Sequence, residues 1–258
     1  MEKNRIKLYR SLHKAGGRDE RGLFLVEGPE LIKEALREGW PLEEVQITHS
    51  FVEESHAGKE LIKLIDLADV PYYLCSNSDM GRISETKTPQ GAIALARYRE
   101  PVSRVNSEEE PEIIVICTCI SDPGNLGTIL RTADWFGIGR VILGEGSADP
   151  FAPKVVRASA GSIFRLKVES ANDTKAIIKR ETKSGRKLYA ATTGGQLLPG
   201  ELPQSGLRGL VMGHETKGIP DDILSICTET VRVGGRGKTE SLNLAVAAGI
   251  LLNAVSNE

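Results

Sequence analysis

The chain has few cysteines and histidines, and they lack the spacing that metal or redox chemistry requires. Its 258 residues include four cysteines (Cys75, Cys117, Cys119 and Cys227), none in a C-x-x-C pair, and four scattered histidines. We therefore expect neither a metal site nor a disulfide framework, and a reducing, cytoplasmic compartment. Cys117 and Cys119 fall in an apolar run at 113–120 that is expected to be a strand, so both are interpreted as core thiols on one face.

Long apolar segments are also missing. No run approaches the roughly 20 residues that cross a bilayer, and the charged N-terminus is not followed by the apolar core of a secretory signal. We therefore expect no membrane partner. A hydrophobic content of 40% and a charged content of 26% are ordinary for a globular protein.

An excess of charge is absent too, because the net charge is −2. The cations are nevertheless unevenly placed. One interpretation of the basic start is a solvated amphipathic helix, and the other is a patch that contacts phosphates. The cations that crowd the first part of the chain are Lys3, Arg5, Lys7, Arg10, Lys14, Arg18 and Arg21, and the apolar side of such a helix would be Ile6, Leu8, Tyr9 and Leu12.

Two regions are predicted on either side of a polar stretch. Residues 1–99 read as a small α/β domain, and residues 100–111, with two prolines and three consecutive acids, read as a linker. The alternative is a long surface loop within one domain. The predicted strands of the first region are 23–26, 45–48, 72–75 and 92–96, and its clearest helices are 30–38 and 52–67.

Residues 112–258 alternate strand and helix with nearly continuous apolar strands. This pattern predicts a parallel sheet covered on both faces, with ligands at the carboxyl ends of the strands. The predicted strands are 113–120, 140–143, 165–168, 188–191, 210–212 and 230–233. The predicted helices are 126–136, 153–159, 174–183 and 239–256. The loops at the carboxyl ends of the strands are 122–127, 192–195, 213–218 and 234–237.

The last predicted helix is apolar almost all the way round. A helix without a polar face is expected to be buried on every side. Ser241 and Asn243, near its beginning, are polar residues that do not fit this apolar pattern. A buried amide costs free energy unless it is hydrogen-bonded, which indicates a site role for Asn243. The competing interpretation of Ser241 is a helix cap.

Three other classes of enzyme are not supported. GGRGKT at 234–239 lacks the first glycine of a P-loop, because Arg232 occupies that position. DPGNLG at 122–127 is not a dinucleotide-binding fingerprint, and no acidic residue ends the next strand at Leu143. The histidines accompany no nucleophile-elbow motif.

Three segments carry a resemblance to a known family. They are NLGTILRTA from Asn125, VMGHETKGI from Val211 and ESLNLAVA from Glu240. In this order and spacing they resemble the SpoU/TrmH branch of the SPOUT methyltransferases, over residues 112–256. The segment FLVEGPELIKEA from Phe24 is similar, over a shorter stretch, to the family's ribosomal-protein-like, RNA-binding N-terminal domain.

The resemblance implies methyl transfer from S-adenosylmethionine to a ribose 2′-hydroxyl of RNA. Ribosomal RNA is favoured over transfer RNA, and a non-catalytic RNA-binding paralogue is the other alternative. It also implies a trefoil knot, a homodimer and a metal-free site. The catalytic residues it implies are Asn125, Arg131, Glu215, Ser241 and Asn243, and the cofactor-binding residues are Thr192, Gly213, Val233 and Leu242.

The same residues allow simpler roles. Asn125 can cap its helix, and Arg131 can form a surface ion pair. Since arginine stays protonated in proteins, we expect Arg131 to position phosphate or ribose and to stabilise a forming alkoxide rather than to act as the base that family proposals include. Glu215 is expected to anchor Asn125, Arg131 or the nucleotide.

The chain departs from the family pattern at two places. His214 stands where the family usually has Asn, which is expected to alter a loop hydrogen bond or a pH response. Val233-Gly-Gly-Arg236 stands where the family usually has Ile-Pro-Met. The second change predicts a more flexible and more cationic cofactor loop.

Overall fold

The structure, a computed structural model, describes residues 1–98 and 111–256. The chain divides into two compact units. The first comprises Met1–Glu100, as far as it is described, together with Phe151–Phe164. The second comprises Pro101–Pro150 and Arg165–Glu258, again as far as they are described. The predicted linker at 100–111 lies outside the described residues except for Pro111.

The first unit is built on a four-stranded mixed sheet, as the sequence predicted for a small α/β domain. Its order is β1-β4-β2-β3, with β4 antiparallel to both of its neighbours and β2 parallel to β3. The strands are β1 (Leu23–Glu27), β2 (Leu42–Thr48), β3 (Tyr72–Cys75) and β4 (Ala92–Arg97), and the helices are α1 (Lys3–Ser11), α2 (Ala15–Arg21), α3 (Pro29–Arg37), α4 (His49–Glu54), α5 (His56–Leu67) and α6 (Asn77–Ile83).

Local capping sets the helices of this unit. The long helix predicted at 52–67 is broken, because Ser55 ends α4 and its hydroxyl accepts a hydrogen bond from Gly58 N at 2.9 Å, which starts α5. The N-terminal helix is amphipathic, as expected. Ile6, Tyr9 and Leu12 are buried against Met80 and other core residues.

The segment Phe151–Phe164 packs with the first unit, although in sequence it lies between β6 (Arg140–Leu143) and β7 (Lys167–Ser170) of the second unit. It contains α8 (Pro153–Ala158) and η1 (Ser162–Phe164). The Phe151 ring centroid lies 4.7 Å from that of Phe24 and 4.6 Å from that of Tyr98. Arg157 Nη1 donates to Glu27 Oε2 at 3.1 Å. The β6–β7 connection therefore contributes core to the first unit.

The second unit contains the predicted parallel sheet, in the order β10-β8-β9-β5-β6-β7, with every pairing parallel. The strands are β5 (Ile113–Cys117), β6 (Arg140–Leu143), β7 (Lys167–Ser170), β8 (Lys187–Ala191), β9 (Arg208–Met212) and β10 (Glu229–Val231). The central strands are buried along almost their whole length, as expected when helices cover both faces.

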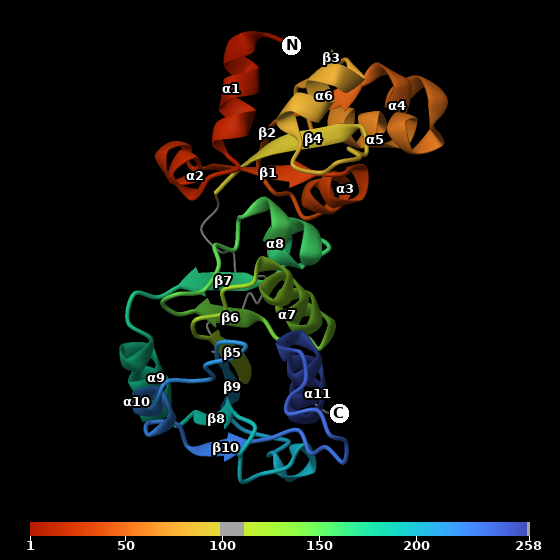
Figure 1. Ribbon diagram of the computed structural model, residues 1–258. Helices are drawn as coiled ribbons and strands as arrows, with labels where there is room; N and C mark the ends of the chain where they lie inside the picture. The colour runs from red at the N-terminus through yellow and green to blue at the C-terminus, as the bar shows by residue number, and fades with distance from the viewer. Residues whose placement is uncertain (99–110, 257–258) are drawn as a thin grey trace. The chain divides into compact units, whose positions relative to one another are not determined.

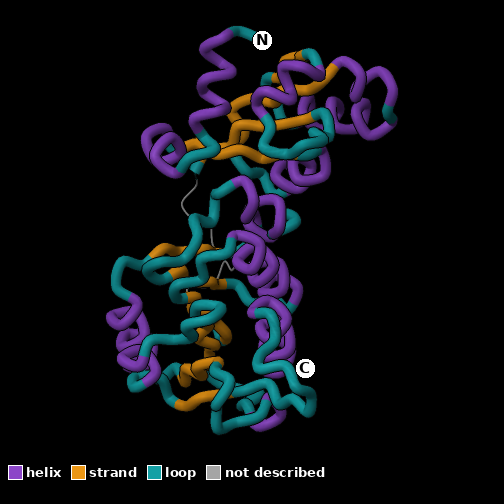
Figure 2. Tube along the Cα trace, in the orientation of Figure 1, coloured by secondary structure: helices purple, strands orange, loops and turns teal. Residues whose placement is uncertain are grey.

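Helices lie on both sides of this sheet. Figure 1 shows α7 (Pro123–Trp135) and α11 (Leu244–Ser256) on one side, and α9 (Thr174–Lys183) and α10 (Asp221–Leu224) on the other. The chain between β10 and α11 is loop throughout (Figure 2), as is much of the path after β8, apart from the short η2 (Pro199–Glu201). These loops follow the carboxyl ends of their strands, which is where the sequence analysis predicts that a ligand binds.

Three details differ from the sequence predictions. The first strand of this unit ends at Cys117, and Cys119 adopts a left-handed backbone with φ of 57°. The two thiols therefore do not share a strand face. Burial raises the pKa of Cys117 to about 12. The last helix begins at Leu244 rather than at 239, and Val246 and Ile250 are 53% and 38% exposed, so it is not buried on every side.

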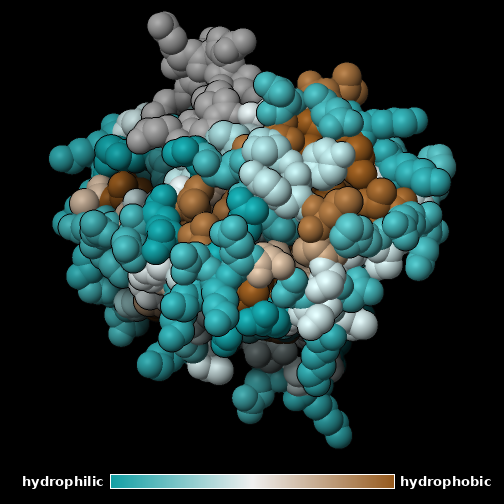
Figure 3. Space-filling view, turned by 90° about the horizontal axis from the view of Figure 1, so that it is seen from above, coloured by the Kyte–Doolittle hydropathy of each residue, from teal (hydrophilic) through white to brown (hydrophobic). Residues whose placement is uncertain are grey.

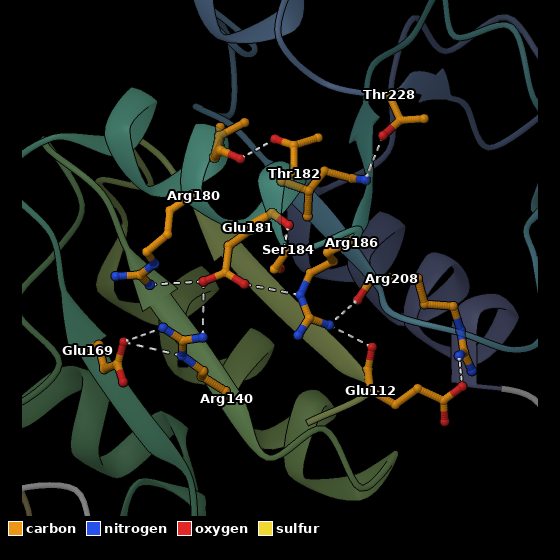
Figure 4. Close-up of polar contacts among 12 residues, drawn as sticks. Glu112, Arg140, Glu169, Arg180, Glu181, Thr182, Ser184, Arg186, Arg208 and Thr228 are labelled. Atoms are coloured by element: carbon orange, nitrogen blue, oxygen red, sulfur yellow. Dashed lines mark hydrogen bonds and ion pairs between the residues drawn. The ribbon is translucent and has the colours of Figure 1, made fainter. Parts of the chain in front are cut away.

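A buried charge network lies at the amino ends of the parallel strands (Figure 4). The Glu181 carboxylate accepts from Arg140 Nη1 and from Arg186 Nε, both at 3.1 Å. Arg208 pairs with Glu112, and its Nε donates to Val255 O near the end of α11 at 2.8 Å. The network therefore ties the last helix to the sheet edge that is opposite the predicted ligand loops.

The surface is mainly hydrophilic on the face that Figure 3 shows, and its hydrophobic residues form separate patches. Within the described residues, no helix is both long and apolar enough to span a bilayer. The trefoil knot and the ribosomal-protein likeness of the first unit remain predictions.

Candidate active site

The site begins at the amino end of α7, which follows β5. Asp122 is the N-cap residue, and its Oδ1 accepts from Asn125 N at 2.8 Å, while Pro123 occupies the first turn. Both features favour a helix start at this point. They leave the Asn125 side chain free for contacts outside its own helix, so the capping role considered for Asn125 belongs to Asp122 instead.

A hydrogen-bonded chain then joins the three sequence motifs. Asn125 Nδ2 donates to Glu215 Oε1 at 3.1 Å, and Asn243 Nδ2 donates to Asn125 Oδ1 at 3.1 Å. Asn243 Oδ1 in turn accepts from Ala245 N at 2.9 Å. We call Glu215, Asn125 and Asn243 the amide relay. It brings together residues 118 positions apart in the sequence.

The Asn125 amide can be oriented in only one way in the relay, because of which atoms can donate and which can accept a hydrogen bond. An ionised carboxylate only accepts, so the Asn125 amide nitrogen must face Glu215 and its oxygen must face Asn243. Burial alone would raise the pKa of Glu215, but the hydrogen bonds from the Asn125 side chain and from backbone N–H groups outweigh burial and lower it. Glu215 is therefore ionised at neutral pH, which keeps both amides fixed.

The start of α11 corrects two predictions. Asn243 does not lie inside the helix, because its side chain caps Ala245 N and Val246 N from the position before it. Ser241 does not provide the cap, and it is exposed in the loop together with Leu242, which is 48% exposed. Of the five predicted catalytic residues, three meet in the relay, and Ser241 lies two positions from it.

Arg131 lies elsewhere on α7. At about 100° per residue, it shares an exposed face with Thr128 and Trp135 rather than with Asn125. Among the described residues it has no ion-pair partner, so the simple surface ion pair considered from the sequence is not formed. Of the partners considered for Glu215, Asn125 is contacted and Arg131 is not. The described partners of the Glu215 carboxylate are Asn125, Asp122 N and, at 3.7 Å, His214.

The predicted cofactor residues follow neighbouring strands. Thr192, Gly213 and Val233 come after β8, β9 and β10 respectively. A Cβ at Gly213 would lie 2.6 Å from the carbonyl carbon of Gly218, so only glycine allows this loop to close on itself. Thr192 N donates to Val231 O at 2.9 Å, which joins the loops after β8 and β10.

Sequence reasoning missed three residues that build these loops. Asp122 caps α7, and the Asp-Pro pair at a helix start was its signal. At Gly195, a Cβ would lie 2.3 Å from the Val231 carbonyl carbon, so the loop after β8 packs tightly on the end of β10. Arg232 donates to Gly195 O. No sequence signal marks Gly195 or Arg232, because their partners are 36 to 37 positions away.

His214, one departure from the family pattern, has a local role. Its Nδ1 accepts from Thr216 N at 3.1 Å, and its backbone pairs with Gly218. The imidazole nitrogen is therefore an acceptor that shapes this turn, and whether it alters the family's loop hydrogen bond or pH response stays a prediction. In the part of the chain that the structure describes, no group of three or more His, Cys, Asp or Glu residues could hold a metal ion.

A parallel α/β sheet with a polar site at its carboxyl edge, joined to a small α/β unit, is typical of an enzyme domain with an added substrate-binding domain. The SpoU rRNA Methylase family matches residues 112–253, and the MRM3-like substrate binding domain matches residues 3–94. The chain therefore belongs to the SpoU rRNA methylase family.

Relatives match along almost the whole chain. The 23S rRNA (guanosine(2553)-2′-O)-methyltransferase RlmP of Bacillus subtilis is 30% identical over 248 residues, covering 96% of this chain and 94% of that protein. A TrmH-family structure from Porphyromonas gingivalis is 32% identical with a TM-score of 0.80, covering 98% and 97%. The AdoMet-bound rRNA methyltransferase of Sinorhizobium meliloti is 28% identical with a TM-score of 0.84, covering 98% and 94%.

Proposed function

We propose that this protein transfers a methyl group from S-adenosylmethionine to a ribose 2′-hydroxyl of ribosomal RNA. The observation that carries the proposal is the amide relay, which joins all three family motifs at the carboxyl edge of the parallel sheet. Family membership supports the activity, and the named activity of the Bacillus subtilis relative supports both the ribose position and ribosomal RNA.

The loops beside the relay fit S-adenosylmethionine. Gly213 admits no side chain, so the main chain itself forms that wall. Leu198 and Leu242 are 41% and 48% exposed, and they offer apolar surface to an adenosine group. Thr192 and Val233 complete the set that would hold the cofactor. The AdoMet-bound Sinorhizobium meliloti structure, similar along 98% of this chain, supports this assignment.

The chain's own residues then have three tasks. When bound, S-adenosylmethionine supplies an electrophilic methyl group on a sulfonium sulfur. Asn125 and Asn243, fixed by Glu215, orient the ribose, and Ser241 adds a hydroxyl beside them. The 2′-oxygen is thereby held in line with the methyl group. Transfer then takes place within one bound complex and does not depend on a collision between free reactants.

Arg131 stabilises the negative charge that forms on the 2′-oxygen as the hydroxyl proton is released to solvent water, while the methyl–sulfur bond breaks and leaves a neutral thioether. Because guanidinium remains protonated, Arg131 holds phosphate or ribose and is not the base. In one chain it stands on the exposed face of α7, apart from the relay. We therefore propose that the protein acts as a homodimer in which a second copy covers this face. The exposed side chains Trp135, Val246 and Ile250 support such an interface.

The site needs no metal, because alignment and charge stabilisation by side chains suffice for methyl transfer. The first unit would grip structured RNA, in keeping with its match to a substrate binding domain. Action on ribosomal RNA supports a cytoplasmic location. The described cysteines are free thiols, which suits a reducing compartment.

The test is incubation with S-adenosylmethionine carrying a labelled methyl group and RNA from a strain that lacks the gene. Label should enter ribosomal RNA. Arg131→Ala should abolish transfer while cofactor binding, measured by calorimetry, survives. Label in transfer RNA alone would change the substrate. If neither transfer nor cofactor binding is seen with the wild-type chain, the protein is a non-catalytic paralogue and the proposal fails.

A further inference from the structure

The N-terminal helix α1 has a one-sided row of cations. Lys3, Lys7 and Arg10 are exposed and, at about 100° per residue, fall within an arc of about 60°. We call them the α1 stripe. The opposite side of the helix, with Ile6 and Tyr9, is buried in the core of the first unit.

The stripe is not neutralised by its surroundings. Three carboxylates near α1 are bound to other cations: Glu44 to Arg5 at 3.1 Å, Asp79 to the N-terminal amine at 2.7 Å and Glu85 to Arg157 at 3.5 Å. None of the three stripe residues has an ion-pair partner within the described part of the chain. The first turn of α1 contains no acidic residue.

This arrangement costs helix stability. Lys3 stands at the amino end, where the helix dipole disfavours a cation. Lys3 and Lys7 are four residues apart and Lys7 and Arg10 are three apart, so like charges face one another along the stripe. An anionic partner that lies along the helix would offset both penalties.

We propose that the α1 stripe binds the phosphate backbone of the substrate RNA, an inference that rests on the proposed function. The stripe spans about 10 Å at about 1.5 Å per residue. A nucleic-acid strand carries one negative charge on every phosphate, so it can place more than one phosphate along that length. A row of three exposed cations, without acidic partners among the described residues, matches such a polyanion. The contact positions RNA without reading its sequence.

The test compares two matched double variants of the full chain. Lys7→Gln with Arg10→Gln removes two charges from the stripe, and Lys59→Gln with Lys63→Gln removes two from the exposed side of α5 in the same unit. Glutamine has a helix propensity close to that of lysine and arginine, so both helices should persist. Binding is measured with deproteinised ribosomal RNA across a salt series, and methyl transfer is measured in parallel.

The stripe variant should reduce the steepness of the log affinity against log salt plot by about 1.4 to 1.8, since each phosphate contact contributes about 0.7 to 0.9. Its KM for RNA should rise while S-adenosylmethionine affinity and the single-turnover rate stay unchanged. The α5 variant should match wild type. Equal slopes for wild type and the stripe variant overturn the proposal.

Binding to phosphatidylserine vesicles but not to RNA would also overturn the inference, because it would assign the stripe to a membrane surface. If wild type binds RNA through the stripe and transfers no methyl group, the proposed function fails while the stripe assignment stands. The two failures are therefore distinguishable.

Discussion

At the residue scale, Asn243 links helix capping to the candidate chemistry. Its side-chain oxygen caps α11, and its amide nitrogen holds Asn125. The two ends of its side-chain amide therefore join the start of α11 to a side chain of α7. The two functions can be separated because Asp has the acceptor but lacks the donor.

Asn243→Asp should keep the cap and lose the contact to Asn125. We expect a melting temperature close to wild type and a methyl-transfer rate lower by on the order of 100-fold, since a small misplacement of the ribose is costly. Asn243→Ala should lose both functions, with a free energy of unfolding lower by about 1 kcal/mol. Thermal melts and single-turnover rates distinguish these outcomes. A fully active aspartate variant would remove the relay from the mechanism.

The sequence predicted which residue types form the site but not how they connect. Asn125, Glu215 and Asn243 were expected there through the family resemblance, and the structure brings them together. The contact between Glu215 and Asn125 was one of three considered from the sequence. The contact between Asn125 and Asn243 was not predictable, because positions 118 residues apart leave no local pattern. The role of Asn243 as a cap was missed because the helix was predicted to begin earlier, at 239.

At the scale of elements, the two ends of the parallel strands differ in what they carry. The carboxyl ends carry the ligand loops, and the amino ends carry the buried network around Glu181. Burial opposes ionisation of Glu181, but the hydrogen bond from Arg180 and the charges of Arg140 and Arg186 outweigh it, so its pKa is lowered from 4.5. Removing one member leaves buried arginines without their carboxylate.

Glu181→Gln should lower the free energy of unfolding by about 3 kcal/mol, as measured by urea denaturation at pH 7. A lowered pKa means that the contribution is complete above the ordinary carboxyl value and is lost as pH falls through the folded value. Below about pH 4, wild type should therefore lose its advantage over the variant.

The matched control is Asp222→Asn, which breaks the exposed pair with Lys175 in the same unit. It should shift the unfolding midpoint far less than Glu181→Gln does. Equal shifts in the two variants would show that the network contributes no more than a surface ion pair.

The positions of the elements were largely predictable, and the ends of some of them were not. The strand at 140–143 and the helix at 174–183 lie where hydrophobic period and capping placed them. The helix predicted at 52–67 failed because Ser55 offers a competing cap. The membership of Phe151–Phe164 in the first unit rests on ring contacts with Phe24 and Tyr98, which no local pattern encodes.

At the scale of the whole molecule, α7 and α11 expose large apolar side chains that bear on whether the protein forms a dimer. Trp135 is 83% exposed and Val246 is 53% exposed, and Arg131 stands on the same face of α7 as Trp135. Large apolar side chains grouped beside an unpaired catalytic candidate are the pattern expected of an interface that completes a site.

Val246→Glu should therefore convert a dimer into a monomer and should abolish methyl transfer. Ala176→Glu, which places the same charge on exposed α9, should leave the dimer intact. Light scattering should give twice the chain mass of 28.0 kDa for wild type and for the α9 variant. A wild-type monomer with full activity would contradict the proposed assembly.

Transfer of the methyl group to ribose is tested by its position on the product. Ribosomal RNA labelled by the wild-type chain is digested to nucleosides and analysed by mass spectrometry, with Arg131→Ala as the inactive comparison. We expect all of the label in 2′-O-methylnucleosides and none with the variant. Label on a base, or equal labelling by the variant, would contradict it.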